Sequence, residues 1–313
     1  MITIFTPTYN RKNELKRLYQ SLLKQDSSNF EWLIIDDGSQ DKTQNYIKTL
    51  IKENKIKIRY FLKENGGKPS AYNMGLEKAE GDIFLSIDSD DILNENILKE
   101  IEKDFKTLNK NAGVIYLQNN IKTKKIIGTK FPKDGESQNY YDIYHKLKVK
   151  GDKLIVLKTD IAKRYPFPLI EKEKFIPEAL IFNRISKNYN LKCRNFVAAS
   201  KEYLENGYSN NYFSLVKKNP IGNSLYFKEE YEFSHSFYNV YGYILFSIYA
   251  KQKFKTILKN HPAKIKIIFM YIPVLIISKI KRWNNEKNIN IRLYSRYGRR
   301  WKSTCWYIKL FKR

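Results

Sequence analysis

Three carboxylates follow an apolar run in residues 82–91, which read Asp-Ile-Phe-Leu-Ser-Ile-Asp-Ser-Asp-Asp. Asp88, Asp90 and Asp91 stand at the expected exit of a buried strand, in a chain with 58 Lys and Arg against 32 Asp and Glu. Carboxylates placed this closely repel one another unless a cation lies among them. Oxygen ligands on a loop suit Mn²⁺ or Mg²⁺, and such ions also bind substrate phosphates. The cluster therefore indicates a metal–diphosphate site, although Asp is also common in ordinary surface turns.

Polar or glycine-rich segments follow the three earlier strands that we expect. They are Pro7-Thr8-Tyr9-Asn10, Asp36-Asp37-Gly38-Ser39 and Glu64-Asn65-Gly66-Gly67-Lys68. A carboxylate at Asp37 can accept a hydrogen bond from a nucleobase or a ribose hydroxyl, and two glycines let the backbone approach a phosphate. Lys68 can pair with that phosphate as a point charge, but Pro69 after it departs from the P-loop pattern. Taken singly, each segment is equally compatible with a turn.

The spacing of apolar residues predicts alternating strands and helices through the first 120 residues. We expect strands over 2–6, 30–36, 56–60, 83–87 and 114–117, and helices over 12–25, 43–53, 70–79 and 94–108. Further on, we expect strands over 153–157 and 191–198 and a helix over 177–187. This order predicts an α/β fold with a mostly parallel sheet flanked by helices. Ligands of such sheets bind beyond the carboxyl ends of the strands, where the polar segments fall.

In their order and spacing, these segments resemble the family-2 glycosyltransferases of the GT-A fold, as found among bacterial surface-polysaccharide enzymes. The resemblance covers residues 1–118 and rests on four motifs. These are Thr6-Pro7-Thr8-Tyr9-Asn10, Ile35-Asp36-Asp37-Gly38-Ser39-Gln40-Asp41, Asn65-Gly66-Gly67-Lys68 through Ala71-Tyr72-Asn73-Met74-Gly75, and Gly81-Asp82 through Asp88-Ser89-Asp90-Asp91. The resemblance implies a Rossmann-like sheet that binds a nucleotide-sugar, followed here by a basic helical C-terminal extension.

The resemblance also implies a role for each motif residue. Donor-binding residues would be Thr6, Pro7, Tyr9, Asp37, Asn65, Gly67, Lys68, Asn73, Asp88, Ser89 and Asp90. Asp37 would accept a hydrogen bond from the base, and Lys68 would border the diphosphate. Asp88 and Asp90 would hold the ribose and the metal ion, Mn²⁺ or Mg²⁺. Asp91 would support or face the donor sugar. Tyr72 stands where many family members carry Arg, so Lys68 would supply that phosphate contact.

Members of this kind invert the anomeric centre and need a general base near the acceptor hydroxyl. The family usually places this acid on a helix after the acid cluster, and Glu178 in residues 175–180 occupies such a place. A glutamate at a helix N-terminus is also favourable for the helix dipole alone. Glu171 and Glu173 are weaker candidates because their neighbours are typical of a loop. Asp152 would either touch the acceptor or belong to a turn.

The C-terminal quarter of the chain carries most of its positive charge. Residues 234–313 hold 18 Lys and Arg and one acid, Glu286, which indicates an anionic membrane surface or nucleic acid as partner. The apolar run 267–277 contains Pro273 and is shorter than the roughly 20 residues of a membrane span, so we expect an interfacial segment. The aromatic-rich stretch 237–250 would add to its aromatic girdle. We expect no nucleic acid partner, because no binding motif accompanies the charge.

Two further segments bear on the mode of action. Processive synthases of the superfamily carry Gln-x-x-Arg-Trp, but Tyr297 takes the Gln position before Arg300-Trp301, which favours the transfer of one sugar. Trp301, Trp306 and Tyr307 are predicted interfacial anchors. Residues 202–209 would form either a lid over the site or a surface turn.

We therefore predict a glycosyltransferase domain over 1–230, with a nucleotide-sugar half (1–118) and an acceptor half (119–230), and a basic aromatic helical region over 231–313. The expected function is metal-dependent inverting transfer of one sugar, most simply from a UDP-sugar, to a lipid-linked or polysaccharide acceptor. A non-catalytic nucleotide-binding scaffold or a basic nucleic-acid-binding protein are the alternatives. Distant cysteines and no apparent secretion signal lead us to expect a cytoplasmic protein held peripherally at the inner membrane face, with a homo-oligomer left open.

Overall fold

The computed structural model of the chain describes residues 1–202 and 212–286. The predicted anchors Trp301, Trp306 and Tyr307, the Arg-Trp pair at 300–301 and residues 203–209 of the proposed lid lie outside these ranges. The strands are β1 (Ile2–Thr8), β2 (Phe30–Asp36), β3 (Ile58–Leu62), β4 (Ile83–Ser86), β5 (Ile92–Leu93), β6 (Gly113–Asn120), β7 (Ser137–Gln138), β8 (Lys153–Lys158) and β9 (Leu191–Lys201).

These strands form one nine-stranded mixed sheet in the order β3-β2-β1-β4-β8-β6-β9-β5, with β7 beside β9. The first four strands pair in parallel, as a βαβ chain order requires. The second half adds antiparallel pairs, β4 with β8 and β6 with β8, while β6 and β9 are parallel. The predicted α/β fold is therefore confirmed, and the antiparallel strands are concentrated in the half that follows β4.

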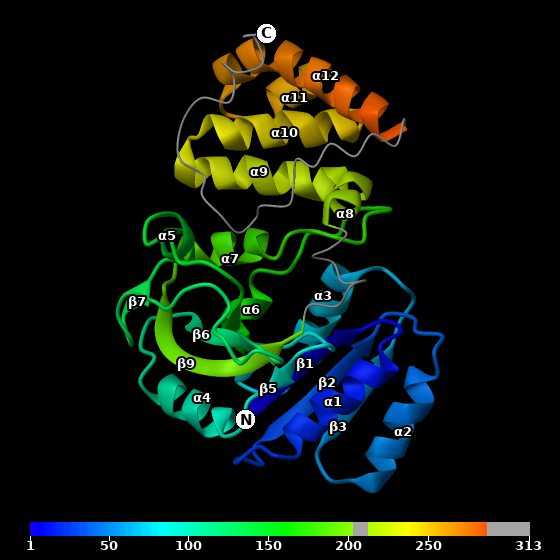
Figure 1. Ribbon diagram of the computed structural model, residues 1–313, viewed down its shortest axis with the longest axis vertical. Helices are drawn as coiled ribbons and strands as arrows, with labels where there is room; N and C mark the ends of the chain where they lie inside the picture. The colour runs from blue at the N-terminus through cyan, green and yellow to red at the C-terminus, as the bar shows by residue number, and fades with distance from the viewer. Residues whose placement is uncertain (203–211, 287–313) are drawn as a thin grey trace.

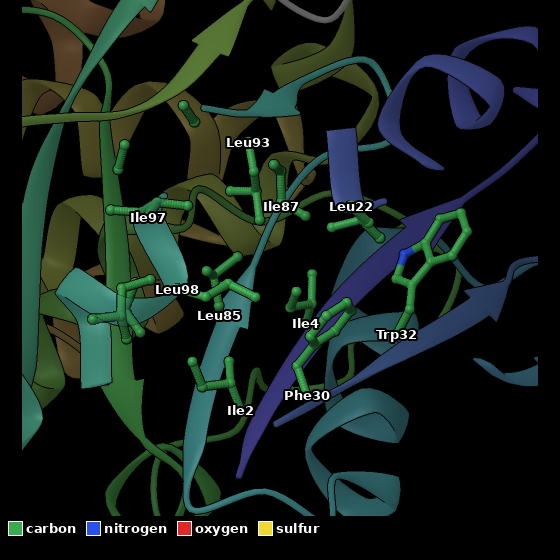
Figure 2. Close-up of a cluster of buried hydrophobic side chains, with 14 of the residues drawn as sticks. Ile2, Ile4, Leu22, Phe30, Trp32, Leu85, Ile87, Leu93, Ile97 and Leu98 are labelled. Atoms are coloured by element: carbon green, nitrogen blue, oxygen red, sulfur yellow. The ribbon is translucent and has the colours of Figure 1, made fainter. Parts of the chain in front are cut away.

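Helices cover both faces of this sheet. They are α1 (Lys12–Leu22), α2 (Thr43–Glu53), α3 (Lys68–Lys78), α4 (Ile97–Lys106), α5 (Tyr140–His145), α6 (Thr159–Lys163) and α7 (Ala179–Ser186). Every residue of β2 is buried, because helices cover the sheet on both faces, and the strand is apolar apart from Glu31 and Asp36. Figure 2 shows the core on one face, where Ile2, Ile4, Leu85, Trp32 and other buried side chains of β1, β2 and β4 meet apolar residues of α1 and α4.

The rest of the described chain forms a separate stack of helices. These are α8 (Tyr212–Lys218), α9 (Pro220–Ser234), α10 (Phe237–Tyr249), α11 (Phe254–Lys259) and α12 (Lys264–Glu286). Figure 1 shows α7, α9, α10 and α12 as successive layers, so that α12 lies farthest from the sheet. Helix α9 runs across the domain boundary predicted at residue 230. None of the helices in the described ranges has both the length and the apolar character that a membrane span requires.

Candidate active site

The carboxyl ends of β1, β2 and β4 meet at one edge of the sheet. The N–H of Asp37, directly after β2, donates to the carbonyl of Thr8 at 2.8 Å. The N–H of Ile87, directly after β4, donates to the carbonyl of Phe5 at 2.9 Å. The sheet thus brings the polar segments of three separate strand exits together, as is general for ligand sites of this architecture.

The buried carboxylate of Asp37 organises the glycine loop after β3. Its Oδ1 accepts hydrogen bonds from Lys63 Nζ at 2.7 Å and from the N–H of Gly66 at 2.9 Å, and its Oδ2 accepts from the N–H of Gly67 at 2.7 Å. Gly67 has a φ of +85°, and a Cβ there would collide with the backbone of Lys174. In this structure, the N–H groups of both glycines are thus hydrogen-bonded to Asp37. A base contact for Asp37 and a diphosphate contact for Gly67 stay predictions.

The acid cluster lies in a turn directly after β4, and its members differ in electrostatic surroundings. Asp88 Oδ1 pairs with Lys68, and its Oδ2 lies 4.0 Å from Lys201 Nζ. Burial opposes ionisation of Asp88, but these two ammonium groups lower its pKa to about 2. Burial and the neighbouring Asp88 raise the pKa of Asp90. Burial raises the pKa of Asp91 to about 8. Lys201 acts in the opposite direction, and the neighbouring Asp88 and Asp90 raise the pKa further. Full ionisation of all three carboxylates is therefore unfavourable unless a further cation lies among them.

Lys68, the first residue of α3, links the acid cluster to the candidate base. Its Nζ contacts Asp88 and lies 2.6 Å from Oε1 of Glu178. Burial alone would lower the pKa of Lys68, but the two carboxylates hold it well above its usual value. One ammonium is thus shared by a residue predicted to bind the donor and by the residue predicted to activate the acceptor.

Glu178 is placed by the C-terminal helices as well as by the sheet. It is the N-cap residue of α7, and the segment before it is fastened to the start of α9. The carboxylate of Glu173 accepts from the N–H of Ile221 at 2.6 Å and from the N–H of Gly222 at 2.7 Å. Asn219 Oδ1 accepts from two N–H groups of the same segment. Glu173 therefore caps α9, which is a structural role for one of the weaker base candidates.

A cavity of about 220 Å³ collects the charged residues of the site. Its charged lining comprises Lys68, Asp88, Asp91, Asp152, Lys153, Glu178 and Lys201, and its aromatic lining comprises Tyr72, Tyr140, Tyr144 and Phe182. No sequence motif includes four of these lining residues, namely Lys153, Lys201, Tyr140 and Tyr144. The sequence signal for Lys201 is only that a lysine ends an apolar strand, and such a residue is usually solvent-exposed.

Other predicted donor residues are not among those that line this cavity. The hydroxyl of Thr6 accepts from Trp32 Nε1 at 3.0 Å. The amide of Asn73 bonds both the carbonyl and the N–H of Phe167, at 2.9 and 2.8 Å. Asn65 donates to the carbonyl of Asp37 at 2.8 Å. Two of the remaining donor candidates, Pro7 and Ser89, are partly or wholly buried, whereas Tyr9 is exposed. Contacts of these residues with a donor stay predictions.

The acid cluster fits a hard divalent cation. Asp90 forms no ion pair with any Lys or Arg of residues 1–202 and 212–286, and Asp91 Oδ1 is a buried oxygen without a hydrogen-bond partner. Within the same residues, no three His, Cys, Asp or Glu side chains are grouped as a metal site. That is compatible with Mg²⁺ or Mn²⁺, which commonly takes one or two carboxylates, water and substrate phosphates. Asp88 and Asp90 are the residues that would hold it.

The sheet, the strand-exit acids and the adjoining cavity define a nucleotide-sugar transferase of the GT-A type. The sequence model of glycosyl transferase family 2 matches residues 3–165, which is more than half of the chain. The chain belongs to glycosyl transferase family 2.

Two curated relatives match the N-terminal part of the chain. An uncharacterized glycosyltransferase of Haemophilus influenzae is 39% identical over 102 residues, which is 32% of this chain and 41% of the relative. The poly(ribitol-phosphate) β-N-acetylglucosaminyltransferase TarS of Staphylococcus aureus is 33% identical over 100 residues, 31% of this chain and 18% of the relative. The chain thus spans less than half the length of each relative.

Solved structures extend the likeness of the fold over nearly the whole chain. Residues 1–349 of S. aureus TarS, in complex with UDP-GlcNAc, match with a TM-score of 0.59 and 16% identity, covering 92% of both chains. The mannosyltransferase PcManGT of Pyrobaculum calidifontis, in complex with GDP-Man and Mn²⁺, matches with a TM-score of 0.55 and 13% identity, covering 92% of this chain and 84% of that one. At such low identity the likeness shows the fold, and donor and metal are those of the neighbours.

Proposed function

We propose that the protein is an inverting, metal-dependent glycosyltransferase that moves one sugar from a nucleotide-sugar to a hydroxyl of a lipid-linked or polysaccharide acceptor in cell-surface glycan synthesis. The observation that carries this proposal is the shared cavity, which Glu178, Asp88 and Asp91 all line and in which Lys68 joins Glu178 to Asp88. A candidate base and a candidate donor-binding cluster, 87 or more residues apart in sequence, thus face one space. A non-catalytic scaffold would have no need of the base.

In this mechanism the acceptor hydroxyl oxygen attacks C1 of the donor sugar. The bond between C1 and the phosphate oxygen breaks, and its electron pair leaves with the nucleoside diphosphate. Glu178 takes the acceptor proton, and Lys68 stabilises the negative charge on the leaving diphosphate. A divalent ion held by Asp88 and Asp90 would add further charge stabilisation of that leaving group.

The donor and acceptor classes are supported by the relatives named above. A TarS structure contains UDP-GlcNAc, which favours a UDP-sugar donor here. The name of TarS describes transfer to a poly(ribitol-phosphate), which favours a surface glycan as acceptor class. The cavity lining contains three lysines and four carboxylates, so the cavity itself has no cationic excess for a strongly anionic acceptor.

A turnover panel tests the proposal. The protein is mixed with UDP-, GDP-, ADP- and CDP-sugars, Mn²⁺ and a membrane extract as acceptor, and release of nucleoside diphosphate is followed. We expect release from one nucleotide class, its loss with EDTA, and its loss in Asp90→Asn. Absence of turnover with every donor would contradict the enzyme proposal, and full activity of Asp90→Asn would contradict the metal assignment.

We also propose that α12 holds the enzyme at an anionic membrane surface. Five large apolar side chains of this helix, Ile265, Ile268, Phe269, Ile272 and Ile276, are between 54% and 76% exposed. At about 100° per residue they fall within an arc of roughly 100°, whereas Ile267, Val274 and Ser278 on the opposite side are buried against the bundle. We call these five residues the outer face of α12.

Charge favours a lipid surface as the occupant of this outer face. Lys264 and Lys279 are exposed on α12 itself, and Lys255 and Lys259 are exposed on the adjoining α11. An apolar face flanked by lysines is the pattern of a helix that lies in an anionic interface. In the aromatic-rich stretch 237–250, α10 buries Val240, Tyr243 and Ile244 in the bundle core, whereas Phe237 and Tyr238 are 63% and 52% exposed. An aromatic contribution from this stretch stays a prediction, and the proposed surface is centred on α12.

A further inference from the structure

Lys201 lies in the middle of the acid cluster, although no sequence motif includes it. It is the last residue of β9, and its side chain is 20% exposed. Its Nζ lies 4.0 Å from Asp88 Oδ2, 4.0 Å from Asp91 Oδ2 and 3.4 Å from Asp152 Oδ2. It lines the same cavity as Lys68 and Glu178.

The distances show that this ammonium is shared and not committed to one carboxylate. Ion pairs closed by a hydrogen bond have N–O distances of about 2.7–2.9 Å. Lys192, near the other end of the same strand, has such a committed arrangement, with its Nζ 3.0 Å from Asp104 Oδ1 and 3.2 Å from the hydroxyl of Thr107. At these distances the ammonium of Lys201 can contact a further anion without breaking a short hydrogen bond to any of the three carboxylates, whereas that of Lys192 cannot.

The carboxylates around Lys201 would repel an incoming diphosphate unless a cation lies between them. Four carboxylates, Asp88, Asp90, Asp91 and Asp152, belong to or face the cluster, and a diphosphate adds more negative charge. Lys68 approaches Asp88 from its Oδ1 and Lys201 from its Oδ2, so the two ammonium groups flank the residue assigned to the donor. A buried, unpaired dianion next to these acids would be strongly repelled.

We propose that Lys201 is a second cation of the donor site, which contacts the diphosphate of the nucleotide-sugar and stabilises the departing nucleoside diphosphate together with Lys68. Lys201 neither gives nor takes a proton in this reaction. The bond that breaks joins C1 to the phosphate oxygen, and the proton of the acceptor hydroxyl goes to Glu178. This inference rests on the proposed transfer from a nucleotide-sugar and adds a residue that binds its leaving group.

Binding of a nucleoside diphosphate tests this role separately from turnover. The probes are the diphosphate that the turnover panel releases, expected to be UDP, and its nucleoside, both with Mn²⁺. Kd is measured by calorimetry for the diphosphate and by NMR titration for the nucleoside. We expect Lys201→Met to weaken diphosphate binding about tenfold to a hundredfold, the loss of one charge-assisted contact, and to leave nucleoside binding unchanged. Lys201→Arg should restore most of the affinity.

Lys192→Met is the matched control, because it removes a buried lysine from the same strand. It should lower the Tm without a selective effect on the diphosphate. Unchanged diphosphate affinity in folded Lys201→Met, or equal losses of diphosphate and nucleoside, would overturn the inference. Lys201→Gln, which keeps hydrogen-bond donors, is used if the Met variant does not fold. If the wild-type protein binds no nucleoside diphosphate, both the proposed function and this inference are contradicted. If the wild-type protein binds it and Lys201→Met binds it with the same affinity, only this inference is contradicted.

Discussion

Glu178 is the residue on which the proposed chemistry depends most directly. The ammonium of Lys68, 2.6 Å away, holds its carboxylate in the lining of the cavity. We predict that Glu178→Gln lowers the rate of transfer about 10²- to 10⁴-fold, the usual contribution of a general base. Its affinity for the nucleoside diphosphate, measured by calorimetry, should stay within about twofold of wild type, because a base does not bind the donor.

Glu171→Gln is the control for this substitution. Glu171 is 87% exposed and pairs with Lys172 at 3.5 Å, so its loss should not change the rate of transfer. If Glu178→Gln retains transfer, or if Glu171→Gln loses it, the base has been assigned to the wrong residue.

Residue types were easier to predict than their partners. The sequence places Asp88, Asp91 and Glu178 near a common site, since each belongs to a recognisable segment. Nothing in the sequence indicates that Asp37 accepts the N–H groups of Gly66 and Gly67, or that Asn73 bonds Phe167. Hydrogen-bond partners are chosen by tertiary geometry, which local patterns do not encode. The role of Lys201 could not be predicted for the same reason, because its neighbours come from other strands and loops.

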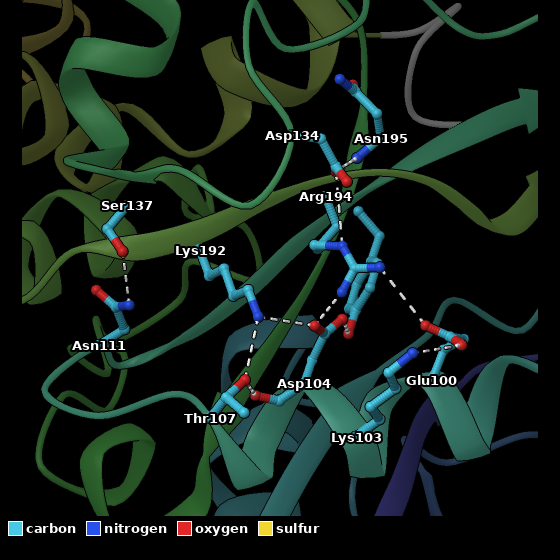
Figure 3. A network of polar contacts seen from close by, with 11 residues as sticks. Glu100, Lys103, Asp104, Thr107, Asn111, Asp134, Ser137, Lys192, Arg194 and Asn195 are labelled. Atoms are coloured by element: carbon cyan, nitrogen blue, oxygen red, sulfur yellow. Dashed lines mark hydrogen bonds and ion pairs between the residues drawn. The ribbon is translucent and has the colours of Figure 1, made fainter.

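At the scale of elements, an ion network joins α4 to β9. The buried carboxylate of Asp104 on α4 accepts a hydrogen bond from Lys192 at 3.0 Å and pairs with Arg194 (Figure 3). It also accepts from the hydroxyl of Tyr116 at 2.9 Å. Burial and the adjacent Asp104 raise the pKa of the Tyr116 hydroxyl, which keeps it a hydrogen-bond donor. The network therefore fixes the start of the strand whose other end carries Lys201.

We predict that Asp104→Asn lowers the free energy of unfolding by about 3 kcal/mol, measured in urea, because it removes the buried carboxylate that two partly buried cations share. Asp160 pairs with Arg164 on the surface, and its side chain is 71% exposed. Asp160→Asn should therefore lower the free energy of unfolding by less than about 1 kcal/mol. Equal effects of the two substitutions would show that the buried network contributes no more than a surface ion pair.

Elements with long, continuous apolar patterns were predictable and short ones were not. The expected strand over 30–36 coincides with β2, and the helix expected over 43–53 coincides with α2. The two-residue strands β5 and β7 have no periodicity to detect. The place of β8 between β4 and β6 depends on long-range pairing, which a strand's own residues do not specify.

At the scale of the whole molecule, the C-terminal helices connect two functions proposed for opposite ends of the structure. Arg184 of α7 forms a two-pronged ion pair with Glu229 of α9, at 2.8 and 2.6 Å, and the start of α9 is fastened to the segment before Glu178. Beyond α9 and α10, α12 lies farthest from the sheet among the described helices (Figure 1), and the side chains of its outer face are exposed. A rigid stack would thus set the height of the cavity above a membrane.

We predict that the double substitution Phe269→Glu and Ile272→Glu reduces co-sedimentation with phosphatidylglycerol vesicles at least tenfold, because it places two charges in the apolar face that would enter the interface. The pair Leu62→Glu and Leu169→Glu, at side chains 49% and 68% exposed elsewhere, should bind these vesicles as wild type does. Binding should be weaker to phosphatidylcholine vesicles and should fall with salt, since lysines attract anionic lipid. Equal binding of both double variants would contradict the assignment. A wild-type dimer in light scattering that Phe269→Glu and Ile272→Glu dissociates would identify a second copy of the chain as the occupant instead.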